Sequence, residues 1–166
     1  AADGSETNSV VIGTDAGNAI NHDNTDGNVI IGNDAGTGGG AALISCVAIG
    51  YNAMNSTGGN AQTGTVAIGK DSLTALTDGS GNTAVGHESA KANNTGYKNT
   101  ALGWNSFITN QTGYSNTAIG AEALYYTTSD ANVAVGDRAG AYTTGDNNTY
   151  VGFKAGFGAS GAENYN

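Results

Sequence analysis

The amino-acid sequence predicts an all-β fold, a parallel β-solenoid in which each sequence repeat forms one coil. Three observations support this prediction. A glycine- and asparagine-rich motif recurs nine times, at intervals of 16–19 residues, along the 166-residue chain. Glycine is abundant, with 28 residues, and proline is absent, which suits a regular array of tight turns. Apolar residues show no sustained helical period, so the pattern does not predict helices.

The repeated motif reads N-T/V-A-I/V-G-x-x-A/S, with clear copies in "NTAVGHESA" from Asn82 and "NTAIGAEAL" from Asn116. A repeat of this length is too short for two helices and a turn, but it fits a coil of two short strands and two bends. Successive coils would stack as parallel strands about 4.8 Å apart. Residues 1–166 are therefore predicted to form a single repeat domain, with motif copies beginning near residues 9, 28, 46, 65, 82, 99, 116, 132 and 148.

Each motif position suggests a structural role. The second and fourth positions share one strand face by alternation, and we assign that face to the interior of the coil, for example Thr83 with Val85. The fifth position is always glycine, which indicates a bend with positive φ or a close backbone approach. The eighth is always Ala or Ser, which indicates a tight site. The first-position asparagines are expected to stack as a hydrogen-bonded amide ladder.

The third position is uncharged in all nine copies, although the alternation places it opposite the face assigned to the interior. A strand that is apolar on both faces is buried on both faces. Because a narrow coil has one interior, the second face is expected to lie against another chain, and small side chains allow close approach around a symmetry axis. The predicted oligomer interface therefore consists of Ala48, Ala67, Ala84, Ala101, Ala118 and Ala134.

Composition argues against several partners and compartments. The formal net charge is −9, and the five basic residues do not cluster in the sequence, so neither nucleic acid nor an anionic membrane surface is an expected partner. No apolar run is long enough to span a bilayer. Cys46 is the only cysteine, which excludes an internal disulfide and a thiolate metal cluster.

The search for catalytic, metal and cofactor sites predicts none. His22 and His87 are the only histidines, and in "His87-Glu88-Ser89" adjacent strand residues point to opposite faces and cannot converge as a catalytic triad. Carboxylates recur just after the glycine bend and could stack as a ladder for hard cations. Asn52, Asn105, Arg138 and Lys154 interrupt that ladder, so solvated charge is the preferred interpretation.

Aromatic residues suggest one candidate binding surface. Tyr97 and Tyr114 occupy equivalent places in successive repeats, and Trp104 lies between them in sequence. Exposed aromatic rings can stack on sugar rings, because both present polarisable apolar faces. We therefore name Tyr97, Trp104 and Tyr114 as candidate glycan contacts, with packing between chains as the competing interpretation.

The motif "NTAIG", followed three residues later by Ala or Ser, resembles the head repeats of YadA-like trimeric autotransporter adhesins and related repeats of phage tail fibres. The resemblance covers nearly the whole chain. It implies a left-handed parallel β-roll, three chains around one axis, and display outside a cell or on a virion. The adhesin repeat is shorter and centred on "SVAIG", a form approached here only by "SVVIG" at Ser9, so phage, bacterial and archaeal origins all stay open.

We therefore expect a structural or adhesive segment of an extracellular trimeric fibre, with no enzymatic activity. The expected partners are further copies of the chain, an end-to-end continuation of the fibre, and a host-surface glycan or protein. The alternatives are a solenoid binding module for ice or glycans, or a subunit of a biofilm-matrix filament. Ice recognition requires a flat threonine array facing solvent, whereas the face assignment above points the motif threonines inward.

Overall fold

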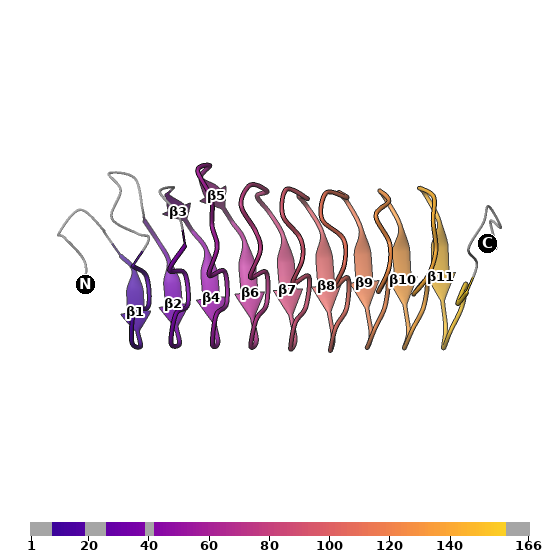
Figure 1. Ribbon diagram of the computed structural model, residues 1–166, viewed down its shortest axis with the longest axis horizontal. Coiled ribbons are helices and arrows are strands. Elements are labelled where there is room, and N and C mark those ends of the chain that lie inside the picture. Colours follow the sequence, from indigo (N-terminus) through magenta and orange to yellow (C-terminus); the bar gives the residue numbers. More distant parts are fainter. Residues whose placement is uncertain (1–7, 19–25, 39–41, 159–166) are drawn as a thin grey trace.

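The computed structural model describes residues 8–18, 26–38 and 42–158. These ranges contain strands and turns and no helix, and their strands form two parallel sheets (Figure 1). The prediction of an all-β parallel solenoid is confirmed. The smaller sheet pairs β3 (Leu43–Ile44) with β5 (Gln62–Thr63). The larger sheet has nine strands, in the order β1 (Val10–Ile12), β2 (Val29–Ile31), β4 (Val47–Ile49), β6 (Val66–Ile68), β7 (Thr83–Val85), β8 (Thr100–Leu102), β9 (Thr117–Ile119), β10 (Val133–Val135) and β11 (Thr149–Val151).

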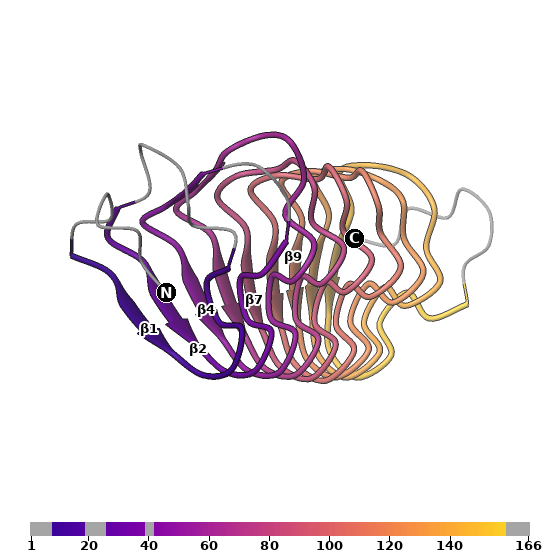
Figure 2. The ribbon, with the colours of Figure 1, turned by 60° about the vertical axis from the view of Figure 1, so that its left-hand side comes forward.

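The pairing register of the larger sheet follows the sequence motif. Ala101 of β8 pairs with Ala84 of β7 on one side and with Ala118 of β9 on the other. Each motif position therefore forms a column that runs along the solenoid, and each repeat forms one coil. Figure 2 shows coils of similar outline following one another from the N-terminal to the C-terminal end.

The motif glycines stack in a column at the bend that follows each strand, as the sequence predicts. Their φ angles lie between +122° and +140°, a backbone region that side chains other than glycine rarely adopt. A Cβ atom on Gly103 would overlap the carbonyl group of Gly120 in the next coil. Both the backbone conformation and the close stacking of the coils therefore require glycine at this position.

Left-handed backbone also occurs at non-glycine positions around the corners of the coil. The seventh position adopts it in Glu88, with φ of +54°, and the ninth position in Leu124, with φ of +48°. Hydrogen bonds between coils hold these corners, for example from the backbone N–H of Glu122 to the carbonyl of Trp104 at 2.9 Å. Stacking of the coils thus stabilises a conformation that a single coil would adopt at a cost.

The predicted asparagine ladder is present at the entrance to the strands. The side-chain oxygen of Asn99 accepts a hydrogen bond from the backbone N–H of Asn116 at 2.9 Å. Its amide donates to the carbonyl of Gly113 at 2.7 Å, and the side chain is buried. Each such asparagine joins one coil to the next and satisfies backbone groups that the corner would otherwise bury without a partner.

The assignment of strand faces made from the sequence was wrong. The third-position side chain points into the coil, and the second and fourth positions point outward, as the alternating burial of β7 and β8 shows. The interior is filled from the opposite side by the ninth position, where Phe107 and Leu124 are fully buried. Because the coil is narrow, a large ninth residue leaves room only for alanine at the third position.

The core volume shared by the third and ninth positions can also be divided the opposite way, with the larger side chain at the third position. In the second repeat the third position is Ile30 and the ninth is Gly36. A Cβ atom on Gly36 would lie 3.1 Å from Cδ1 of Ile30, closer than ordinary packing allows. The two positions therefore exchange volume across the core, which explains how third-position residues other than alanine are accommodated.

Candidate functional site

The outward side of the nine-stranded sheet is a regular surface to which all nine strands contribute. We call it the outer strand face; it consists of the second and fourth motif positions. None of these eighteen residues is charged. The second-position row is Val10, Val29, Val47, Val66, Thr83, Thr100, Thr117, Val133 and Thr149. The fourth-position row is Ile12, Ile31, Ile49, Ile68, Val85, Leu102, Ile119, Val135 and Val151.

The outer strand face is partly accessible to solvent in the single chain: its residues are exposed in the two end coils and half-buried in most of the coils between them. Ile12 is 58% exposed and Ile119 is 36% exposed, whereas the alanines between the two rows are covered by the coil. Branched aliphatic side chains in this density rarely remain in water without a partner. The face is therefore a candidate interaction surface built from every coil.

The alanines predicted to form the oligomer interface do not lie on a surface. Their exposed fractions are 0–1%, and all of them belong to the hydrophobic core of the coil. They cannot contact another chain without opening the coil, so this prediction is corrected for Ala48, Ala67, Ala84, Ala101, Ala118 and Ala134.

A signal for the correct faces was present in the sequence. The copies with glycine at the ninth position include those with Val11, Ile30 or Tyr150 at the third position. The copies with Met54, Leu73, Phe107 or Leu124 at the ninth position carry alanine at the third. This reciprocal change in volume indicates two positions that share one enclosed space.

The structure separates the three candidate glycan contacts into two places. Tyr97 and Tyr114 stack with ring centroids 5.0 Å apart and an angle of 5° between the rings. Trp104 is 51% exposed but follows β8, whereas Tyr97 and Tyr114 precede β8 and β9, so it lies at the opposite end of the strands. The neighbouring Asp130 carboxylate and the Tyr97 phenol raise the pKa of Tyr114, mainly by opposing the negative charge of its ionised form.

A second group of aromatic residues escaped the sequence analysis. Tyr125 and Tyr126 contact edge to face, Tyr126 stacks on Tyr142, and Tyr142 contacts Phe157 at 90°. We call these four residues the C-terminal aromatic cluster. The sixteen-residue spacing of Tyr126 and Tyr142, one repeat length, was the signal that could have identified it.

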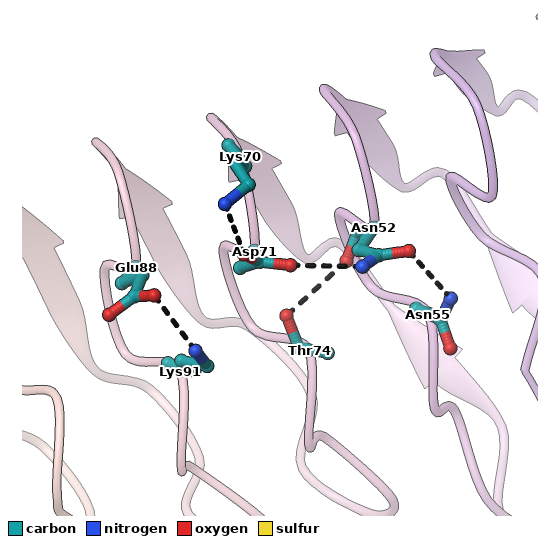
Figure 3. Close-up of polar contacts among 7 residues, drawn as sticks. All are labelled: Asn52, Asn55, Lys70, Asp71, Thr74, Glu88 and Lys91. Atoms are coloured by element: carbon teal, nitrogen blue, oxygen red, sulfur yellow. Dashed lines mark hydrogen bonds and ion pairs between the residues drawn. The ribbon is translucent and has the colours of Figure 1, made fainter.

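The carboxylates beside the glycine bend form separate polar contacts (Figure 3). Asn52 donates to Asp71 at 3.0 Å, Lys70 lies 3.3 Å from the same carboxylate, and Lys91 pairs with Glu88 at 2.8 Å. Burial raises the pKa of Asp71, but the hydrogen bonds from Asn52 and Lys70 outweigh burial, so its pKa lies below the ordinary value. Among the residues that the structure describes, no group of three or more His, Cys, Asp or Glu side chains is arranged to hold a metal ion.

The residues of the "His87-Glu88-Ser89" sequence lie in different environments. His87 is exposed, whereas Ser89 is buried and donates a hydrogen bond to the carbonyl of Ala101 at 2.9 Å. Glu88 pairs with Lys91. The Ser89 hydroxyl therefore serves the core of the coil, while His22 lies outside the described residues.

Comparisons of the chain with protein-family models, curated proteins and solved structures found no match. Throughout the described ranges, no helix has the length and apolar character needed to span a bilayer.

Proposed function

We propose that this chain is a structural and adhesive segment of an extracellular trimeric fibre, of the kind found in phage tail fibres and bacterial adhesin heads. The observation that carries the proposal is the outer strand face, an uncharged aliphatic and threonine surface repeated on nine coils. Three copies would pack in parallel with these faces toward a common axis. The corrected interface thus consists of the second- and fourth-position residues in place of the alanines.

The size of the face supports burial against protein. Nine strands spaced about 4.8 Å apart extend for roughly 43 Å, and three residues span about 10 Å, which gives an area of roughly 400 Å² per chain. A patch of this size falls within the range of the largest apolar patch on a typical monomer, which is often an interaction site. The fourth-position row is aliphatic throughout, which favours contact with other aliphatic side chains over contact with water.

The regularity of the face supports a symmetric partner. Every coil presents the same two rows in register, so a second copy placed in parallel meets equivalent residues along its whole length. Closed cyclic arrangements of identical chains bury such a face completely and leave no open contact surface. The extracellular location and the choice of three copies follow from the family resemblance and are part of the proposal.

The experiment is a mass measurement on the purified chain and two charge variants. Light scattering is expected to give about three times the 16.4 kDa chain mass. Leu102→Asp places a charge on the outer strand face and is expected to give a folded monomer, because the charge would be buried without a partner. Gln111→Asp places the same charge on an exposed residue outside that face and should remain trimeric. A wild-type chain that is a stable monomer would exclude the proposal.

A second candidate function is ice binding. The sequence pattern placed the motif threonines inside the coil, which argued against ice binding, but in the structure they lie on the outer strand face. Thr83, Thr100 and Thr117 lie on consecutive strands and point outward. The aliphatic fourth-position row is less suited to ordering water than a double threonine row, so the fibre remains the preferred function. A thermal hysteresis assay separates the two: activity in a monomeric wild type that is lost in Thr100→Lys would establish ice binding, and absence of activity would reject it.

A further inference from the structure

The C-terminal aromatic cluster lies on the outer surface of three consecutive coils. Its residues belong to the part of each coil that begins at the ninth motif position and runs back from the corner, which we call the return segment. Leu124 and Ala141 of this segment point into the core, whereas Tyr126 and Tyr142 are 50% and 42% exposed. Phe157 in the following coil is 43% exposed. The backbone N–H of Tyr126 donates to the carbonyl of Ala141 at 2.7 Å, so the coils hold these rings next to one another.

The rings of this cluster are oriented differently from the Tyr97–Tyr114 pair. In that pair the rings are nearly parallel, and each covers one face of the other. In the cluster the angle changes from 26° between Tyr126 and Tyr142 to 90° between Tyr142 and Phe157. An edge-to-face contact forms a corner in which a ring face stays open to a ligand. A sugar ring can stack in such a corner, because its C–H groups are attracted to the electron-rich face of an aromatic ring.

Two basic side chains adjoin the cluster on consecutive coils. The ammonium group of Lys154 lies 5.4 Å from the centroid of Phe157 and 5.1 Å from that of Phe153, and it has no carboxylate partner among the described residues. Arg138 donates from Nε to Glu122 at 2.5 Å, and its side chain is 43% exposed. Within the described part of the chain, its two terminal amino groups have no hydrogen-bond partner.

We propose that Tyr126, Tyr142, Phe157, Arg138 and Lys154 form a binding surface for an acidic glycan, a chain of pyranose sugars that carry carboxylates. Sugar rings stack on the open aromatic faces, and the carboxylates accept charge-assisted hydrogen bonds from Arg138 and Lys154. Charge complementarity selects this ligand class: Lys154 lies beside Phe157 with no carboxylate partner among the described residues, and Arg138, although paired with Glu122, keeps its two terminal amino groups free within the described part of the chain. A neutral sugar would leave the Lys154 ammonium group without an anionic partner.

This binding surface does not depend on the proposed trimer. It belongs to the return segment, whereas the outer strand face belongs to β1, β2, β4 and β6–β11. Both surfaces are therefore accessible at the same time, and in a trimer the glycan surface would be repeated three times. Loss of the trimer in Leu102→Asp would leave glycan binding by each chain in place.

The test is calorimetric titration of the full chain with oligogalacturonate, an acidic pyranose oligomer, and with its methyl ester, in which the carboxylates are neutral. Oligogalacturonate is expected to bind in a salt-dependent manner, and the ester at least about tenfold more weakly. Tyr142→Ala is expected to weaken binding by about tenfold, and Arg138→Gln with Lys154→Gln by more than that. Circular dichroism of each variant should match the wild type, because all three side chains lie at the surface outside the core of the coil.

The matched controls use the other aromatic pair. Tyr114→Ala and Lys98→Gln remove an exposed tyrosine and an exposed lysine from the Tyr97–Tyr114 stack, and both variants should bind oligogalacturonate with unchanged affinity. Equal affinity for the acid and its ester would overturn the assignment of an acidic ligand. Undetectable binding of oligogalacturonate at millimolar concentration would reject the surface as a glycan site, as would a loss of affinity confined to the Tyr114 and Lys98 variants.

Discussion

The ring of Tyr150 occupies the space that a side chain on Gly156 would require, and a Cβ atom at Gly156 would overlap that ring. Tyr150 stands at the third motif position, where the six coils directly before it carry alanine. It is 3% exposed and also lies over Gly140 of the preceding coil. One aromatic side chain therefore fills core volume that a ninth-position residue fills elsewhere, for example Leu124.

This relationship predicts compensation between the two positions. Gly156→Leu alone should destabilise the chain by roughly 1–3 kcal/mol or more through overpacking against the Tyr150 ring. Tyr150→Ala alone should cost about 3–5 kcal/mol by opening a cavity. The double variant Tyr150→Ala with Gly156→Leu restores the pattern of Ala118 with Leu124 and should be more stable than the sum of the single effects. Urea unfolding of the four proteins measures the coupling, and strictly additive effects would contradict the shared volume.

The glycine column predicts a contrast between Gly103 and Gly152. Both have φ angles above +120°, so alanine strains the backbone at either position. At Gly103 a Cβ atom also overlaps the next coil, whereas at Gly152 none of the residues that the structure describes lies within 4 Å of it. Gly103→Ala should therefore be several kcal/mol less stable than Gly152→Ala. Thermal unfolding followed by circular dichroism provides the comparison, and equal losses would show that coil contact contributes nothing.

The asparagine ladder predicts a large effect from one amide. Asn99→Ala removes the acceptor of the Asn116 N–H and the donor to the Gly113 carbonyl, all of them buried. Two buried groups without partners should cost about 3 kcal/mol in the free energy of unfolding. Gln111→Ala changes an exposed side chain and should cost less than about 0.5 kcal/mol. A mild effect at Asn99 would mean that water replaces the amide.

The corrected strand faces predict different outcomes for two neighbouring substitutions. Ala101→Asp places a carboxylate in the core of the coil and should prevent folding, because the interior offers it no partner. Leu102→Asp should leave each coil folded while abolishing self-association. Circular dichroism and light scattering together distinguish the two results. A folded monomer from Ala101→Asp would restore the original alanine interface.

The buried thiol of Cys46 predicts a specific loss of stability at alkaline pH. Burial raises the pKa of Cys46 above the ordinary value of a thiol, while hydrogen bonds with the backbone at Thr65, Ile44 and Gly64 partly oppose the shift. Because the folded-state pKa is raised, the stability that the protonated thiol contributes is fully present below the unfolded-state pKa. It is lost as pH rises through the folded-state pKa. The wild type should therefore lose more unfolding free energy between pH 7 and pH 10 than Cys46→Ala. The same burial should make native Cys46 react slowly with thiol reagents, and rapid labelling below the unfolding transition would contradict it.

Local patterns in the sequence determined the repeat, the parallel stacking, the glycine column and the asparagine ladder. Each of these depends on residue spacing along one coil and on its recurrence in the next, as Asn99, Gly103 and Asn116 illustrate. Spacing also showed that Thr83 and Val85 share a strand face. It could not say whether that face points inward, because alternation is the same in either case.

The tertiary structure decided which strand face is buried and which aromatic rings remain open. Ala101 points inward because Phe107, six residues later, returns across the coil and fills the remaining volume. The ring angles in Tyr126, Tyr142 and Phe157 likewise depend on contacts between coils that no single repeat contains. Close packing of a narrow interior is a property of the whole coil, so the inward side chains follow from the volume on both sides of it.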